Sequence, residues 1–170
     1  MAENEQFNRY VETLLEKGAA DVKIINPRSI TTAPWVVFKC QFGCPNYGKN
    51  LCCPPRTPTY ELTRKILDSY RIAILFHTHD RKNTTRMAEE VSRQIFFDGY
   101  YKTQAFGSGP CTLCRECNLN KGCLNPSIAR PSMEACGIDV FQTARDNGFI
   151  INTLKNRNER TDNFGLILVY

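Results

Sequence analysis

The sequence predicts an α/β fold, in which one compact domain spans residues 1–170 and a small mixed sheet is flanked by helices. Three observations support this prediction. Several segments carry apolar residues at helical spacing, and short runs rich in β-branched and aromatic residues lie between them. Nine cysteines gather mainly in two stretches that lack a regular apolar pattern. Helices interspersed with short strands are typical of an α/β sandwich, which here would carry two cysteine-rich cluster-binding loops.

The first half of the chain shows helix and strand patterns on both sides of a cysteine-rich loop. Phe7, Tyr10 and Leu14 recur at helical spacing. The stretch after Cys40 consists largely of Gly, Pro, Asn and Cys, which is typical of a loop. The expected elements are an amphipathic helix that ends at Gly18, strands at 22–25 and 34–38, the first cysteine loop at 40–58, and a helix at 59–70.

The second half continues this alternation around a second cysteine loop. Residues 71–76 contain a continuous apolar run, which fits a buried strand. Met87, Val91 and Ile95 have helical spacing. The elements expected here are that helix with a cap at Asn83 or Thr84, a short strand or turn at 104–106, the second cysteine loop at 107–131, a turn capped by Ser132, a helix at 139–146, and strands at 149–154 and 164–170.

The opening segment and the apolar runs predict a cytoplasmic protein without a membrane partner. The segment MAENEQFNRY lacks both the basic start and the apolar stretch of a secretory signal. The longest apolar runs are far shorter than the ~20 residues that span a bilayer. In a reducing compartment, clustered cysteines are more often metal ligands or redox groups than disulfides. A chain of 170 residues can also bury a core without crosslinks.

The charge balance does not predict a nucleic-acid partner. The chain has 22 Lys and Arg against 17 Asp and Glu, which gives a formal charge of +5. Metal-bound cysteines are thiolates, so two four-cysteine sites would reduce the formal charge to about +1. The sequence contains no long basic run, and we expect its basic residues on a solvated surface.

The second cysteine loop carries the clearest metal-binding pattern, Cys111-x2-Cys114-x2-Cys117-x5-Cys123. Three cysteines at successive two-residue gaps allow one short loop to surround a single inorganic body. The bacterial ferredoxin run has the same first three cysteines, whereas zinc sites usually use two separated pairs. The spacing therefore favours an iron–sulfur cluster, with zinc as the alternative.

The first cysteine loop contains Cys40, Cys44, Cys52 and Cys53, together with glycines and prolines that suit a preformed metal site. Cys52 and Cys53 are adjacent, and adjacent side chains of an extended segment point in opposite directions. Cys53 is followed directly by Pro, as is the fourth ligand of ferredoxins, and is the stronger candidate. Cys52 is either the last ligand of the same site or its buried neighbour.

Three motifs in these regions resemble a known family. They are the Cys-x3-Cys-Pro-x-Tyr-Gly-Lys run that ends in Cys-Pro-Pro, the Gly-x-Gly-Pro-Cys-x2-Cys-x2-Cys stretch, and Arg-Pro-Ser-Met-Glu-Ala-Cys-Gly-Ile-Asp-Val at residues 130–140. Together they resemble cysteine-rich predicted metal-binding proteins, a domain of unknown function, from anaerobic bacteria and archaea. The resemblance covers about residues 39–148 and implies a metal, expected to be iron–sulfur, without an established reaction. It carries the metal role over to Cys40, Cys44, Cys53, Cys111, Cys114, Cys117 and Cys123.

The division of the ligands between two clusters is open at this point. One scheme gives each loop its own cluster of four cysteines. A crossed scheme, as in two-cluster ferredoxins, places Cys53 with the second loop. In a third scheme only Cys40, Cys44 and Cys53 bind the first cluster, which leaves one iron open for a water, sulfide or substrate. The family pattern does not require Cys52, and Cys136, among apolar neighbours, is expected to be a core thiol.

Two histidines and several polar residues are further candidates. His77 and His79 are two residues apart, so in a strand they would share one face near its C-terminal end. They could be metal ligands or proton donors, but a polar pair at the sheet edge is the favoured interpretation. Glu134 and Asp139 could serve acid–base chemistry, although a role as helix caps is favoured. If an open iron binds an anion, the candidate neighbours are Tyr47, Lys49 and Arg56.

These patterns predict an iron–sulfur protein with two [4Fe-4S] clusters. It would act in electron transfer, or as a redox or metallocluster accessory protein, in an anaerobic or reducing cytoplasm. One alternative is an enzyme that uses an open iron for non-redox chemistry such as desulfuration or dehydration. The other is a zinc-stabilised binding module. The partner would be a redox protein in the first case and a small-molecule substrate in the second.

Overall fold

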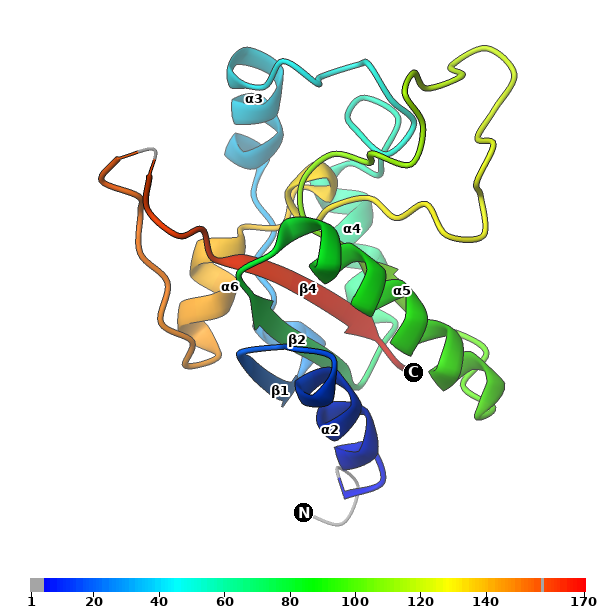
Figure 1. Ribbon diagram of the computed structural model, residues 1–170, viewed down its shortest axis with the longest axis vertical. Coiled ribbons are helices and arrows are strands. Elements are labelled where there is room, and N and C mark those ends of the chain that lie inside the picture. The colour runs from blue at the N-terminus through cyan, green and yellow to red at the C-terminus, as the bar shows by residue number, and fades with distance from the viewer. Residues whose placement is uncertain (1–4, 157) are drawn as a thin grey trace.

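The computed structural model describes residues 5–156 and 158–170 and is built around a four-stranded sheet (Figure 1). The strand order is β1-β2-β4-β3, and every neighbouring pair is antiparallel. The strands are β1 (Asp21–Ile25), β2 (Ala73–Thr78), β3 (Gln104–Phe106) and β4 (Asn163–Leu168).

The prediction of a mixed sheet is wrong, and the position of β4 gives the reason. Strand β2, helix α5 (Arg81–Phe97) and strand β3 form a unit in which both strands run in the same direction. Strand β4, from the end of the chain, is inserted between them and is antiparallel to both. Within the described residues, the parallel strands are therefore never hydrogen-bonded neighbours. This split arrangement depends on a distant strand, so local sequence patterns do not show it.

One face of the sheet is covered by α2 (Asn8–Glu16) and α5, which lie in front of it in Figure 1. Leu14 of α2 and Val91 of α5 belong to one buried cluster with Ile74 and Ile167 of the central strands. The helices predicted over these two segments are therefore confirmed, and their apolar faces form half of the core.

The other face is covered by a second set of helices, which pack with Leu75 and Leu166 in a separate cluster. Because β2 and β4 bury side chains on both faces, their sequences are nearly continuous apolar runs. The predictions of helices at 59–70 and 139–146 are confirmed, with Thr59 and Asp139 as their caps. The helices on this side are α4 (Tyr60–Asp68), α6 (Val140–Asp146) and two short 3-10 helices, η1 (Pro27–Ser29) and η2 (Glu134–Cys136).

The expected strand at 34–38 is wrong, because these residues open helix α3 (Pro34–Gly43). Pro34 stands in the first helical turn, where its missing N–H removes no intrahelical hydrogen bond. The apolar run that follows has no alternation, and such a run does not distinguish a strand from a helix. Phe38 and Phe42 are exposed on α3 and lie 4.8 Å apart between ring centroids.

Two other expectations also change. Residues 149–154, expected as a strand, pair with no strand in the described part of the chain. The cap of α5 is Asp80, not Asn83 or Thr84, and its carboxylate accepts hydrogen bonds from the N–H groups of Lys82 and Asn83.

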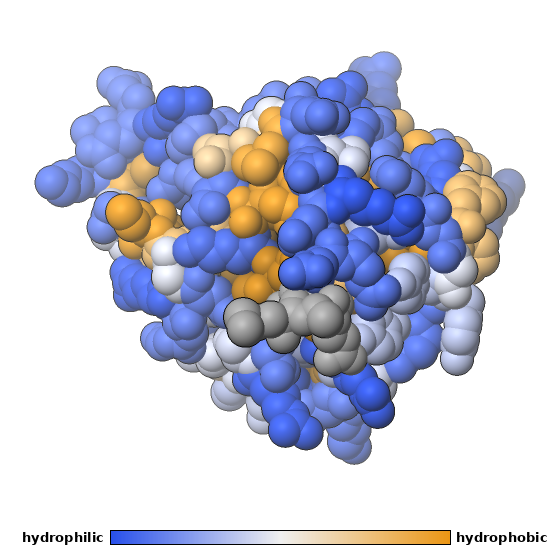
Figure 2. Space-filling model, turned by 90° about the horizontal axis from the view of Figure 1, so that it is seen from below, coloured by the Kyte–Doolittle hydropathy of each residue, from blue (hydrophilic) through white to orange (hydrophobic). Residues whose placement is uncertain are grey.

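The end of the molecule farthest from the cysteine-rich segments is a largely hydrophilic surface (Figure 2). Apolar side chains reach this face only in limited strips. Among the described helices, none is long and apolar enough to cross a membrane.

Tyr10 joins α2 to the C-terminal end of α5. Its ring is buried, and its hydroxyl donates a hydrogen bond to Asp98 Oδ2 (2.7 Å) and accepts one from Arg9 Nη2 (2.6 Å). Burial, followed by the hydrogen bond to Asp98, raises the pKa of Tyr10 to about 12. The neutral phenol is therefore the form that the folded protein favours.

We predict that ionisation of Tyr10 lowers the free energy of unfolding between pH 10 and pH 12. The unfolded chain releases this proton near pH 10, whereas the folded chain keeps it to about pH 12. The decrease in the free energy of unfolding approaches about 1.4 kcal/mol per pH unit in this range. Urea unfolding of the wild type and Tyr10→Phe measures it, and the stability difference between them should shrink as the pH rises. A constant difference over this range would contradict the prediction.

Candidate metal centre

The two cysteine-rich segments lie together beyond one end of the sheet, next to α3 (Figure 1). The backbone N–H of Leu51, in the first segment, donates a hydrogen bond to Cys117 Sγ in the second (3.4 Å). The two segments therefore meet, and thiols that are far apart in the sequence become neighbours.

Cys40 and Cys44 are positioned by helix α3. Cys40 lies in the last turn of this helix, and Cys44 caps its C-terminal end with its N–H donating to the Cys40 carbonyl (3.1 Å). The loop expected at 40–58 therefore begins inside a helix. Residues four apart lie on the same face of a helix, so the Cys-x3-Cys spacing places both side chains on one side.

Three cysteines line one wall of a cavity of about 380 Å³: Cys40, Cys44 and Cys53. Burial, followed by the neighbouring Cys44 thiol, raises the pKa of Cys40, and burial also raises the pKa of Cys53. Tyr47 and Glu134 line the same cavity, and burial raises the pKa of the Glu134 carboxyl. The cavity thus combines three thiols with polar groups that a bound molecule could contact.

The other five candidate cysteines surround a second, smaller cavity. One of them, Cys52, comes from the first segment and shares a hydrogen bond with the Cys111 thiol. Cys52 and Cys53 thus face different cavities, in a turn where the Cys53 N–H donates a hydrogen bond to the Asn50 carbonyl (3.2 Å). The structure groups the eight thiols as three and five, where the simplest sequence scheme has four and four. The thiols around the smaller cavity are Cys52, Cys111, Cys114, Cys117 and Cys123.

Burial makes ionisation of the Cys52 thiol unfavourable without a compensating positive charge. Burial, followed by the nearby Cys111 thiol, raises the pKa of Cys52 to about 12. A thiol must lose its proton to bind a metal, and the charge of the metal then offsets the repulsion between thiolates. A set of half-buried thiols around one cavity therefore fits a metal centre.

Asparagines in both segments contact the cysteines. Asn125 donates from its backbone N–H to Cys123 Sγ (3.4 Å) and from Nδ2 to Cys114 Sγ (3.1 Å). Asn50 Oδ1 accepts a hydrogen bond from the Cys52 N–H (3.1 Å). The sequence analysis missed Asn50 and Asn125, for which the only signal was their place inside the cysteine loops.

The spacing of the sulfur atoms is wider than a single tetrahedral ion requires. Ligands 2.3 Å from a zinc ion at tetrahedral angles lie about 3.8 Å from one another. Across the described ranges, 5–156 and 158–170, the only three metal-ligating side chains with atoms all within 4.8 Å of one another are His77, His79 and Asp162. No three cysteine sulfurs in those ranges all lie within 4.8 Å of one another.

The remaining candidate residues have structural roles or are exposed to solvent. Arg56 Nη1 donates to the Gly48 carbonyl (3.0 Å) and supports the first segment, while Lys49 is exposed. Asp139 caps α6, as expected. Cys136 is fully buried in the core, and burial raises the pKa of its thiol to about 12.

The comparison with known families supports metal binding. The family model described as Predicted metal-binding protein (DUF2284) matches residues 23–169. No curated protein and no solved structure matches the chain. Because the matched region spans most of the chain and all nine cysteines, the chain belongs to the DUF2284 family of predicted metal-binding proteins.

Proposed function

We propose that this metal-binding protein holds two [4Fe-4S] clusters and serves in electron transfer, or as a redox accessory protein, in a reducing cytoplasm. The observation that carries the proposal is the gathering of five thiols from two segments around one small cavity. The spacing of the sulfur atoms supports an iron–sulfur cluster over a single zinc ion. Two of these thiols also accept hydrogen bonds from Asn125.

In this proposal each group of thiols holds one cluster. Cys111, Cys114, Cys117 and Cys123, with Cys52 beside them, would hold the second cluster, and Cys40, Cys44 and Cys53 would hold the first. When bound, such clusters accept and release single electrons. Hydrogen bonds to sulfur and the solvent exposure of the site set the reduction potential, so the contacts from Leu51 and Asn125 are where this chain would tune it.

The adjacency of Cys52 and Cys53 favours electron transfer between the two sites. One peptide unit joins a thiol of each group, and consecutive Cα atoms are about 3.8 Å apart. Cys53 also lies near Cys111 of the other group. The two sites are therefore neighbours, and a redox partner protein could exchange electrons with one site through the other.

A second candidate function follows from the cavity of about 380 Å³. Only three cysteines line it, so a cluster held by them would keep one iron open for a small-molecule substrate. Glu134, whose pKa is raised by burial, is positioned to hold a proton at the cavity wall. Desulfuration and dehydration are the reaction classes that this arrangement suits.

We predict that anaerobically purified protein contains about eight irons and about eight sulfides per chain, as two four-iron clusters require. Metal and sulfide analysis, together with electron paramagnetic resonance of the reduced protein, measures this content. Stoichiometric zinc without sulfide would contradict the proposal.

Substitution at the two adjacent cysteines should have separable effects. Cys53→Ala should remove the first cluster, about four irons per chain, because it leaves only two thiols at that site. Cys52→Ala should leave the paramagnetic resonance signal and iron of the first cluster unchanged, since Cys52 faces the other group. Cys136→Ala, which removes a thiol from the core, is the matched control and should keep both clusters. Loss of the first signal in Cys52→Ala would contradict this division.

The open iron can be tested with an exogenous ligand. Cyanide added anaerobically to the reduced protein should shift the signal of the first cluster, because three thiols leave one position facing the cavity. The signal of the second cluster, surrounded by five thiols, should not move. If neither signal changes at saturating cyanide, the enzymatic alternative is wrong and the electron-transfer role stands.

A further inference from the structure

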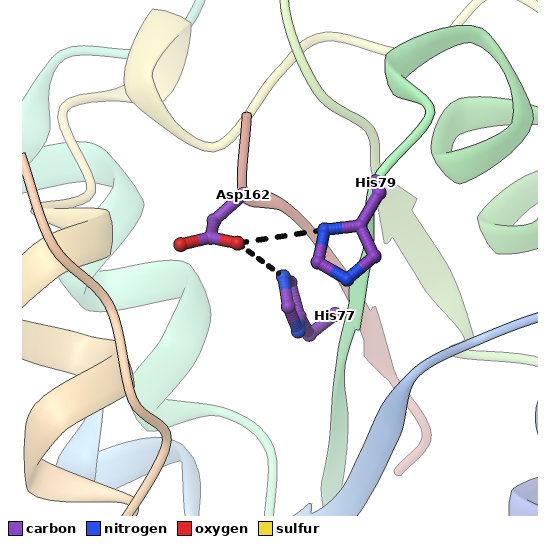
Figure 3. Close-up of side chains that lie close together, drawn as sticks. All are labelled: His77, His79 and Asp162. Carbon is purple, nitrogen blue, oxygen red and sulfur yellow. Dashed lines mark hydrogen bonds and ion pairs between the residues drawn. The ribbon is translucent and has the colours of Figure 1, made fainter. Parts of the chain in front are cut away.

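A second set of metal-ligating side chains lies at the ends of the two central strands. His77 is near the end of β2, His79 follows that strand, and Asp162 directly precedes β4. In the antiparallel register, Thr78 faces Asn163, so the next pair outward is His79 and Asp162. His77 and His79 share one face because they are two residues apart. Figure 3 shows both imidazole rings turned towards the Asp162 carboxylate.

The three side chains converge on one carboxylate oxygen. Asp162 Oδ1 lies 2.9 Å from His77 Nε2 and 3.5 Å from His79 Nδ1. The two imidazole rings meet edge to face, with centroids 4.6 Å apart. All three ligand atoms lie within 4.8 Å of one another. This spacing is close to that of three ligands around one transition-metal ion, about 3 to 3.5 Å for bonds of 2.0 to 2.2 Å.

One nitrogen of this group has no hydrogen-bond partner. His79 Nδ1 is buried and is left unsatisfied, because the Asp162 oxygen at 3.5 Å is too far for a good hydrogen bond. A buried polar atom without a partner is costly. A cation between the three ligand atoms would satisfy this nitrogen and the carboxylate oxygen together.

The surrounding core holds the group in place. The His77 ring stacks on Phe164, with centroids 5.0 Å apart and an angle of 21° between the planes. Phe164 is buried and packs edge to face against Phe149. The first histidine is therefore fixed by aromatic packing before any ligand binds, which lowers the entropy that metal binding costs.

We propose that His77, His79 and Asp162 form a mononuclear site for a divalent transition-metal ion of the Zn²⁺ or Fe²⁺ class. Two imidazoles and one carboxylate are the ligands that such ions take in catalytic sites. Three protein ligands leave at least one position for water or a small molecule. Asp162 lines the same cavity of about 380 Å³ as Cys40, Cys44 and Cys53, so a molecule in that cavity lies next to these three thiols and to one of the three proposed ligands.

Anaerobic titration of the purified protein with Co²⁺ tests this site. We expect one Co²⁺ per chain, with ligand-field absorption and no new thiolate-to-cobalt charge-transfer band. His79→Ala and Asp162→Asn should each weaken binding by about 100-fold or more, beyond the 10- to 100-fold typical of changes around the ligands. Asp146→Asn, an exposed carboxylate on α6, is the matched control and should bind as the wild type does.

Three results would overturn the proposal: no Co²⁺ binding by the wild type, unchanged affinity in both site variants, or a thiolate charge-transfer band. Circular dichroism and unfolding curves verify that the variants are folded. Cys114→Ser should bind Co²⁺ with the affinity of the wild type. This result would show that the Co²⁺ site is distinct from the cysteine centre. Iron and sulfide are measured in the same samples. If Co²⁺ does not bind but iron and sulfide are present, the histidine site is wrong and the iron–sulfur proposal is unaffected.

Discussion

The pairing of β4 between β2 and β3 is the constraint on which the rest of the molecule depends. This pairing completes the open sheet with the last strand of the chain, and both faces of the two central strands are buried. Each face then supports its own layer of helices. The same pairing fixes Asp162 beside His79. It also positions Phe164, which lines the cavity that Cys40, Cys44 and Cys53 share. The site at this end therefore forms only when the last strand is in place.

The sequence predicted the parts of the fold that depend on local patterns. The apolar spacing of Leu14 and Val91 identifies two helices, and the continuous run through Ile74 identifies a buried strand. The direction of the sheet was not predictable in this way, because it depends on which strand enters between β2 and β3. The apolar run after Pro34 was also ambiguous, since a short apolar run without alternation fits a buried strand as well as the helix that it forms.

For the candidate site, spacing identified the cysteines but not their grouping. The difficulty that the sequence posed at Cys52 and Cys53 disappears once two cavities are present, because the two thiols then belong to different groups. The contribution of Asn125 and the convergence on Asp162 depend on contacts between distant segments. Asp162 follows residues 158–161, which form neither a helix nor a strand, so no periodic pattern in the sequence could connect it with His77.

The Cys52–Cys53 pair has a consequence for how the two thiol groups assemble. A shift of one residue in this loop would move both thiols away from the cavities that they now line. Anchoring either thiol fixes its neighbour through one rigid peptide unit. In the proposed two-cluster protein, filling one site would therefore restrict the position of the neighbouring thiol in the other.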